Sequence, residues 1–354
     1  MGSFTAAAPA LAAAMLFGAS TPFAKRLLGD VDPWLLAGLL YLGSGVGLAV
    51  LSLARRGLTH GPAAEAPLSR ADLPWLGAVV LLGGALGPLL LMLGLRQTPA
   101  ATASLLLNAE AIATMLIAWL VFHENADRRI VLGAGATIAG AALLSWHSGT
   151  LGGSWGTLLI LGACLAWGID NNLSRRLSAA DPVLIAMIKG LVAGTANLGL
   201  ALIHGASWPG LRPVIEAGAL GFLGYGASLV MFMRALRGLG AARTGAYFSL
   251  APFIGAIIAV SLFGEPITTR LILAAALMAL GLYLHLAERH EHEHAHETMQ
   301  HDHAHGHDAH HDHEHAPDVP AGEPHSHPHT HRPMIHRHPH YPDLHHRHRH
   351  HDHA

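Results

Sequence analysis

The sequence predicts an all-α membrane protein, a fold class that its composition, the length of its apolar runs and an internal repeat indicate together. Of the 354 residues, 51% are hydrophobic and only 12% are charged. Before Leu286 the charged residues stand mostly in short clusters between apolar runs of about 17 to 23 residues, and crossing the hydrocarbon core of a bilayer takes roughly 20 such residues in a helix. A soluble domain does not repeat that length so regularly.

We expect ten transmembrane helices, joined by links that are mostly short. Their order is better defined than their ends, which the pattern locates only to within a few residues. The ten expected spans are Phe4–Ala24, Trp34–Leu53, Leu73–Leu95, Ala100–Phe122, Ile130–Trp146, Trp155–Leu173, Val183–Ile203, Val214–Leu236, Ala241–Phe263 and Leu271–Leu286.

The distribution of Lys and Arg predicts the orientation of these spans. An even number of spans puts both termini on one side of the membrane. If that side is the cytoplasm, ten Lys and Arg residues lie at inner loops and helix ends and five at outer ends, which agrees with the positive-inside rule. The N-terminus lacks the basic segment of a cleaved signal peptide. We therefore expect a multi-pass protein of the cell (inner) membrane, with the N-terminus as its first span and both termini in the cytoplasm.

An internal repeat relates the two halves of the apolar region. The segment from Phe17, FGASTPFAKRLL, aligns with the segment from Trp167, WGIDNNLSRRLS. Further on, the segment from Leu95, LRQTPAATASLLLNAEAIATMLIAWLVFHE, aligns with the segment from Leu236, LRGLGAARTGAYFSLAPFIGAIIAVSLFGE. Each repeat holds five spans, and an odd number forces the two repeats into opposite orientations, an arrangement typical of secondary transporters. The expected division is a first repeat over 1–147, a second repeat over 148–288 and a tail over 289–354.

These features resemble the EamA branch of the drug/metabolite transporter superfamily. The resemblance covers roughly residues 10–287 and is carried by the five-plus-five arrangement, the Gly-to-Lys/Arg end of each repeat's first helix, and the closing segments LVFHE and LFGEPI. It implies export or exchange of small solutes, usually without ATP. The second repeat has the family's usual SLAP from Ser249, whereas the first has NAEA from Asn108. The resemblance also allows a metal substrate, because relatives in the superfamily export nickel-group cations.

Several other classes of protein are disfavoured. The chain has no Walker-type phosphate-binding motif, so we expect neither an ATP-driven pump nor an enzyme, and no obligatory cofactor. The Arg residues are scattered at helix ends rather than aligned along one face, which disfavours nucleic-acid binding. The single cysteine, Cys164, excludes a disulfide framework, and we expect it to be a small buried apolar residue.

Charged residues inside the spans are the first candidates for a site, because they are costly in a bilayer. Glu110 lies near the middle of the fourth span, where it would act as a substrate ligand or a proton carrier. Asp170, followed by Asn171, and Lys189 lie at similar depth in the sixth and seventh spans. These two charges could pair, either along an ion path or merely to lock two helices together.

Three polar residues extend this candidate site. Asn108, Ser104 and Ser249 could complete an oxygen-rich cavity, or could serve only as hydrogen-bond donors between helices. Glu124 and Glu265 close their spans, and we expect them to be solvated or to form salt bridges at the helix tips.

The tail is predicted to bind transition-metal ions. Five of the 30 histidines precede His290 and the other 25 follow in His-x-His patterns. Neutral imidazole suits Zn²⁺, Cu²⁺, Ni²⁺ and Co²⁺. The tail cannot bury apolar surface, so we expect it to be disordered. Its first part interleaves acidic residues and is the expected ligand set: His290, His292, His294, His296, His301, His303, His305, His307, His310, His311, His313 and His315.

Two functions remain open at this stage. The first is export of divalent transition-metal cations, Ni²⁺ or Co²⁺ and then Zn²⁺, with the tail capturing or sensing the ion. The second is export of a small metabolite or drug by a protein whose tail only buffers or senses metal. Either function implies the lipid bilayer and a small solute or ion as partners, and a homodimer is compatible with both.

Overall fold

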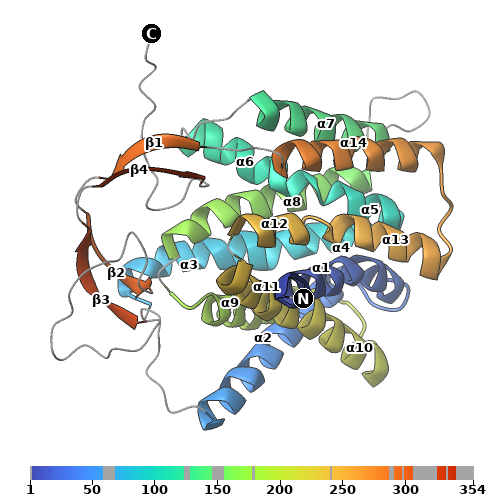
Figure 1. The fold of residues 1–354 in the computed structure, drawn as a ribbon. Coiled ribbons are helices and arrows are strands. Elements are labelled where there is room, and N and C mark those ends of the chain that lie inside the picture. Colours follow the sequence, from blue (N-terminus) through green and yellow to red (C-terminus); the bar gives the residue numbers. More distant parts are fainter. Residues whose placement is uncertain are drawn as a thin grey trace.

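The computed structural model is a bundle of long helices followed by short paired strands (Figure 1). It describes residues 2–58, 68–122, 128–145, 155–177, 180–239, 241–286, 291–296, 299–305, 325–331 and 334–339.

Helices occupy every range in which the sequence predicts a span. Those of the first half are α1 (Gly2–Leu27), α2 (Pro33–Leu58), η1 (Arg70–Asp72), α3 (Leu73–Val79), η2 (Val80–Leu86), α4 (Gly87–Gln97), α5 (Ala100–Leu106), α6 (Ala109–Phe122) and α7 (Arg128–Ser145). Those of the second half are α8 (Trp155–Ser174), η3 (Arg175–Leu177), α9 (Pro182–Ile203), α10 (Leu211–Gly221), η4 (Phe222–Ala227), α11 (Ser228–Leu239), α12 (Ala241–Phe248), α13 (Ala251–Phe263) and α14 (Thr269–Leu286).

Among the described residues, seven helical segments are long and apolar enough to cross a membrane. The apolar parts of α7 and α14 are shorter, and α8, which ends in polar residues, is not among the seven candidates. The prediction of ten crossings therefore stays a prediction. The seven segments are Ala7–Leu27, Pro33–Ala54, Arg70–Gln97, Ala100–Val121, Pro182–Ile203, Leu211–Leu236 and Arg243–Phe263.

Two kinds of irregularity recur in both halves. The third predicted span of each half contains a glycine-bearing π-helical segment, η2 in the first and η4 in the second. The fourth span of each half is broken, between α5 and α6 and between α12 and α13. At the second break Pro252 starts a new helix, a position where its missing N–H is not needed. Irregular turns of this kind are frequent at functional sites.

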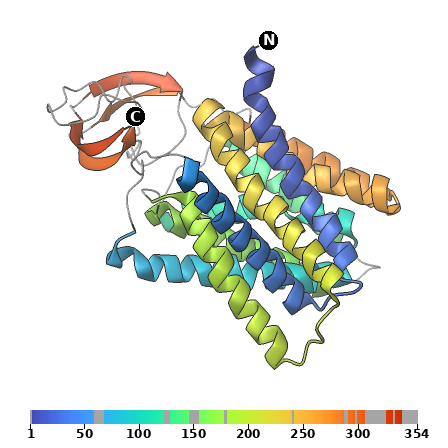
Figure 2. The ribbon, with the colours of Figure 1, turned by 90° about the horizontal axis from the view of Figure 1, so that it is seen from below.

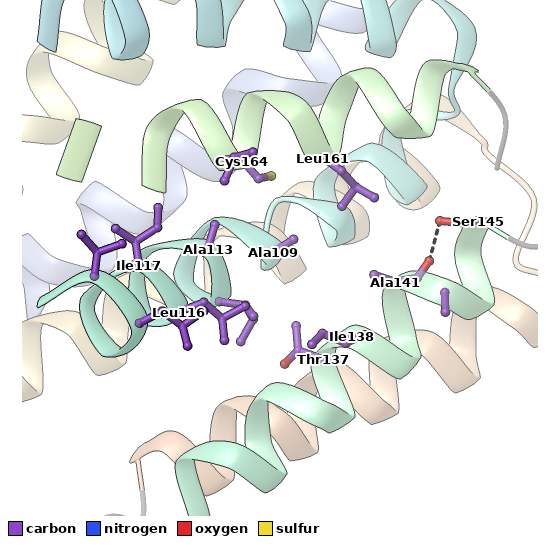
Figure 3. A pocket seen from close by; sticks show the side chains of 15 residues that line it. Ala109, Ala113, Leu116, Ile117, Thr137, Ile138, Ala141, Ser145, Leu161 and Cys164 are labelled. Carbon is purple, nitrogen blue, oxygen red and sulfur yellow. Dashed lines mark hydrogen bonds between the residues drawn. The ribbon is translucent and has the colours of Figure 1, made fainter. Parts of the chain in front are cut away.

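Small residues bring the helices close together. Helix α2 packs along α9, where a Cβ added to Gly38 would lie 2.7 Å from the backbone nitrogen of Leu198, and one added to Gly190 would lie 2.7 Å from that of Gly45. Close approach through small residues stabilises helix pairs in membranes. Helix α7 packs mainly on α14 and is separated from α6 by an apolar cavity (Figure 3).

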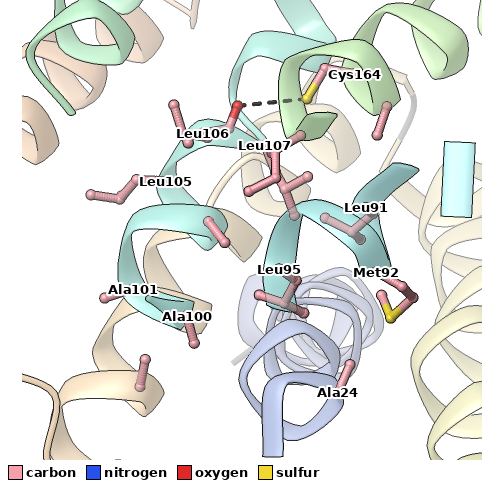
Figure 4. Packing of buried hydrophobic residues seen from close by; sticks show 14 of the residues in the cluster. Ala24, Leu91, Met92, Leu95, Ala100, Ala101, Leu105, Leu106, Leu107 and Cys164 are labelled. Atoms are coloured by element: carbon pink, nitrogen blue, oxygen red, sulfur yellow. Dashed lines mark hydrogen bonds between the residues drawn. The ribbon is translucent and has the colours of Figure 1, made fainter. Parts of the chain in front are cut away.

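The larger apolar core cluster runs through α1, α2, α4, α5 and α8 and extends to α7, α9, α10, α13 and α14; part of it is drawn in Figure 4. Leu95, Leu106 and Met92 are fully buried there. Cys164 is 1% exposed and free, so the prediction of a buried cysteine is confirmed. Its thiol donates a hydrogen bond to the carbonyl of Leu106, 3.6 Å away, across the α5–α8 contact. The bundle in which these helices lie side by side is visible from a second direction in Figure 2.

Four short strands lie among the described residues of the tail. They are β1 (Glu291–His296), β2 (Met299–His305), β3 (His325–His331) and β4 (Met334–Pro339). Strand β1 pairs antiparallel with β4, and β2 pairs antiparallel with β3. The His-x-His pattern has a period of two residues, which is also the period of a strand. The expectation of a disordered tail stays a prediction.

Candidate functional site

Glu110 occupies the first turn of α6, directly after the break in its span. The break forms at Leu107 and Asn108, where the amide of Asn108 donates to the carbonyl of Leu105 at 2.8 Å and so competes with regular helical bonding. A carboxylate in the first helical turn is stabilised by the backbone N–H groups that face it. The break therefore holds an acidic side chain at membrane depth.

An amide and a hydroxyl accompany this carboxylate. The side-chain nitrogen of Asn171, on α8, donates to Glu110 Oε1 at 3.0 Å and lies 3.2 Å from Thr114 Oγ1. Thr114 in turn donates to the backbone carbonyl of Glu110 at 2.9 Å. Glu110 is half-buried and Asn171 is exposed. The group thus combines one negative charge with neutral polar atoms and stays accessible on one side.

Asp170 and Lys189 form an ion pair between α8 and α9, as the sequence predicted. Lys189 Nζ lies 2.5 Å from Asp170 Oδ2, and the two side chains are 18% and 5% exposed. Ser174 donates to the other carboxylate oxygen at 3.4 Å. Both charges also interact electrostatically with Glu110.

The π-helical segment η2 holds the ion pair from the other side. A Cβ added to Gly83 would overlap the Asp170 carboxylate and lie 2.7 Å from Lys189 Nζ. The carbonyl of Gly83 accepts hydrogen bonds from Tyr41 Oη at 2.9 Å and from Trp167 Nε1 at 3.0 Å. One glycine therefore lets α2, α8 and α9 meet at the pair.

Three predicted site residues do not join this cluster through any described hydrogen bond. Asn108 donates to Leu105 and contacts the sulfur of Met278 at 3.8 Å. Ser249 donates to the carbonyl of Gly245, one turn back on α12, at 2.7 Å. Ser104 is buried, and within the described part of the chain its hydroxyl has no hydrogen-bond partner. The oxygen-rich cavity expected around these three side chains is therefore not what the described contacts form.

Several members of the cluster were not predicted. Tyr41, Trp167 and Thr114 read as ordinary residues of apolar spans, and only their contacts reveal them. Asn172 donates to the carbonyls of Thr114 at 3.0 Å and Gly168 at 2.8 Å, and its buried Oδ1 has no described partner. The repeated polar run after Asp170 was the one available signal, and it was used only for Asn171.

A second arrangement, here called the α4–α5 clamp, consists of Lys25 and Glu265. The two oxygens of Glu265 accept from the backbone nitrogens of Ala100 and Ala101 at 2.6 and 2.8 Å. Lys25 Nζ donates to the carbonyl of Leu95 at 2.7 Å and to the next carbonyl at 3.1 Å. Glu265 was expected to be solvated or to form a salt bridge, but it caps a helix, because it meets the free N–H groups at the start of α5.

Of the twelve predicted tail ligands, six lie in the described strands β1 and β2 and six lie outside the described residues. Those in β1 are His292, His294 and His296, and those in β2 are His301, His303 and His305. The remaining predicted ligands lie outside the described residues: His290, His307, His310, His311, His313 and His315. The backbone register places His292 opposite His338 and His303 opposite His327.

A multi-pass helical bundle with paired helix breaks and charged groups at membrane depth defines a polytopic membrane transporter. The chain belongs to the EamA-like transporter family, whose model matches residues 5–146 and again residues 154–287. The resemblance to the drug/metabolite transporter superfamily is thereby confirmed.

Known relatives agree with this class. An uncharacterized transporter of Methanothermobacter thermautotrophicus is 28% identical over 291 residues, 77% of this chain and 83% of the relative. A probable terminal-alkyne amino-acid exporter of Streptantibioticus cattleyicolor is 25% identical over 62% of this chain and 78% of its own length. One solved crystal structure has the same fold, with a TM-score of 0.57, 20% identity, and coverage of 80% of this chain and 96% of that one.

Proposed function

We propose that this protein is a secondary exporter of a small metabolite that carries a positively charged amine, such as an amino acid, and that Glu110 binds the amine. The observation that carries this proposal is the difference between the partners of two carboxylates, those of Asp170 and Glu110. Asp170 is already neutralised by Lys189 at 2.5 Å, whereas the hydrogen bond described for the Glu110 carboxylate comes from the neutral amide of Asn171. A single accessible negative charge with neutral polar neighbours suits one ammonium group.

The transport mechanism in this proposal is alternating access between two inverted repeats of five spans. Support comes from the two separate matches of the family model and from the π segments and breaks that recur in both halves. Broken helices near the midplane bind substrates in such folds because they expose backbone groups. Both termini are cytoplasmic and the membrane is the cell membrane. The amino-acid substrate class takes further support from the relative described as a probable amino-acid exporter.

A second candidate, export of Ni²⁺, Co²⁺ or Zn²⁺, is favoured by the histidines of the tail. The strand register would align histidines of β2 and β3 at three alternate cross-strand positions: His301 with His329, His303 with His327, and His305 with His325. In this candidate the tail captures the ion, and Glu110 and Asp170 lie along its route. The described residues contain no group of three His, Cys, Asp or Glu side chains close enough to hold a metal ion, so the helices would provide a carboxylate path and not a preformed metal site.

Accumulation assays separate the two candidates. Cells carry the full-length chain, the Glu110→Gln variant, a chain ending at Leu286, or the control Ser261→Ala, whose exposed hydroxyl only bonds back to Ile257 at 2.7 Å. Cellular amino acids and Ni²⁺, Co²⁺ and Zn²⁺ are then measured. We expect the full-length chain, the truncated chain and the control to lower the level of at least one amino acid, and Glu110→Gln to lose this effect.

The opposite pattern would reject the proposal. If amino-acid and amine levels are the same with and without the full-length chain, the substrate class is wrong. If the full-length chain instead lowers Ni²⁺, Co²⁺ or Zn²⁺ and Glu110→Gln abolishes that decrease, the metal candidate replaces it.

A further inference from the structure

An apolar cavity of about 560 Å³ lies between α6, α7 and α8 (Figure 3). Its wall is built mainly of alanine and branched aliphatic side chains, including Leu116 and Ile117 on α6, Ile138 on α7 and Leu161 on α8. Helix α7 contacts α6 only lightly, because it packs chiefly on α14. The cavity therefore separates the α7–α14 pair from α6 and α8, and we call it the α6–α7 crevice.

The side chains that line the crevice offer no free polar atom. The hydroxyl of Thr137 donates to the carbonyl of Gly133 at 3.1 Å, and that of Ser145 to Ala141 at 2.7 Å. The thiol of Cys164 donates to the carbonyl of Leu106, outside the crevice. A polar solute or a group of water molecules would lose hydrogen bonds on entering such a space. The occupant it fits is a hydrocarbon.

The crevice opens through a rim of exposed apolar side chains. Leu120 is 63% exposed and Leu165 is 51% exposed, and both belong to the lining. Beyond the rim, the outward face of α7 is also apolar, with Leu132 and Val131 exposed. In a multi-pass membrane protein this outward apolar surface meets the bilayer. The crevice is thus continuous with the lipid-facing surface, where acyl chains are the surrounding solvent.

We propose that the α6–α7 crevice binds one acyl chain of a bilayer phospholipid. The chain enters between Leu120 and Leu165 and fills the space that α7 leaves beside α6. Its inner end reaches Ala109 and Cys164, next to the helix break that precedes Glu110. The lipid then completes the packing of the broken span from the side that the α7–α14 pair does not cover. This assignment depends on the membrane location alone and holds for either substrate class.

Photolabelling of the full-length protein tests this assignment. The protein is placed in nanodiscs of phosphatidylethanolamine and phosphatidylglycerol that contain a phosphatidylcholine with a photoactivatable diazirine in one acyl chain. Labelled positions are located by mass spectrometry. We expect the label to concentrate on residues such as Leu116, Ile117 and Ile138, well above the level on Leu273 of α14, which is 52% exposed but does not line the crevice.

Tryptophan variants of two alanines on α7, Ala142 and Ala139, test whether the labelling is specific to the crevice. Ala142→Trp fills the crevice from its exposed rim and should reduce its labelling several-fold. Ala139→Trp adds the same indole to an exposed position outside the lining and should leave the labelling unchanged. Leu165→Ala widens the rim without filling the crevice, so its crevice should be labelled at least as strongly as that of the original chain. This variant keeps the test valid if either tryptophan variant folds poorly.

Three outcomes would overturn the proposal. One is equal labelling of the crevice and of Leu273. Another is undiminished crevice labelling in a folded Ala142→Trp protein. The third is crevice labelling that falls as far in folded Leu165→Ala as in Ala142→Trp, although Leu165→Ala leaves the crevice open.

Discussion

Two interfaces between the halves share a scaffold but differ in charge at corresponding positions: a charged interface, where η2 and α6 lie against α8, and an uncharged interface, where η4 and α13 lie against α1. By the sequence repeat, Glu110 corresponds to Ala251, and Asp170 corresponds to Ser20. Gly83 of η2 faces Asp170, and its counterpart Gly224 of η4 faces Ser20 in the same way, since a Cβ added there would lie 2.8 Å from the Ser20 Cβ. The geometry recurs, but one copy has an acid where the other has a hydroxyl.

The difference teaches that the scaffold and the site are separable. At the uncharged interface, a Cβ added to Gly18 of α1 would overlap the backbone carbonyl of Ala251, which is itself only 1% exposed, so a carboxylate at 251 would be buried. At the charged interface, the corresponding Gly168 of α8 lies closest to Ala113, about one turn further along α6. That offset leaves Glu110 accessible. One interface packs tightly and the other holds the polar cluster.

The largest expected effect follows from removing the accessible carboxylate. Glu110→Gln keeps the size of the side chain and a hydrogen-bond acceptor for Asn171, but removes the charge, so we expect loss of transport with near-normal expression. Moving the acid to the uncharged interface, as Glu110→Ala with Ala251→Glu, should not restore transport, because Gly18 covers that position. Transport in the exchanged variant would show that the two interfaces are equivalent, and the comparison would fail. Solute efflux from membrane vesicles is the measurement.

Breaking the buried ion pair should have the next largest effect. Lys189→Met leaves the Asp170 carboxylate buried without its cation, and such a loss costs about 3–5 kcal/mol of stability. The double variant Lys189→Met with Asp170→Asn carries no unpaired charge and should recover most of that loss, because the uncharged interface holds the neutral Ser20 in the corresponding place. Thermal unfolding in detergent measures both. A double variant as unstable as the single one would mean that the charge itself is not the cause.

The contrast between the two π segments gives a smaller effect. Gly83→Ala places a methyl group against the Asp170–Lys189 pair, and overpacking of this kind costs about 1–3 kcal/mol. The close contact of Gly224→Ala is with the Cβ of Ser20 at 2.8 Å, while Ser20 Oγ and the Leu16 carbonyl oxygen lie at the ordinary distances of 3.5 and 3.6 Å; the added variant Ser20→Gly removes the close contact. We therefore expect Ser20→Gly to relieve the overpacking of Gly224→Ala at the cost of one more helical glycine, about 1 kcal/mol, while Gly83→Ala lowers both the unfolding temperature and transport. Equal behaviour of the two alanine variants would contradict the difference between the interfaces.

Much of this bundle could be predicted from the sequence, because apolar run length and repeats report directly on helices in a bilayer. The pairing of Asp170 with Lys189 was predictable from their similar depth in adjacent spans. The break at Asn108, the π segment at Gly83 and the hydrogen bonds of Tyr41 were not, since they depend on contacts between residues far apart in the chain. The paired strands of the tail could not be predicted from its amino-acid composition, since the pairing also joins segments that lie far apart in the chain.

The smallest expected effect concerns the α4–α5 clamp, in which Glu265 of the second half caps a helix of the first half. Glu265→Gln removes the charge and leaves one oxygen for the two backbone nitrogens of Ala100 and Ala101, so we expect a loss of about 1 kcal/mol, typical of a helix cap. The matched control is Glu216→Gln, which breaks only the exposed pair with Arg212 at 2.7 Å and should change stability by less than about 1 kcal/mol.

In the sequence repeat Glu124 corresponds to Glu265 and lies outside the described residues. If Glu124→Gln lowers the unfolding temperature as much as Glu265→Gln, both broken spans are capped in the same way and only the charge near Glu110 distinguishes the two interfaces. If it does not, the clamp is a second asymmetry, and the α12–α13 span is the one freer to move during transport.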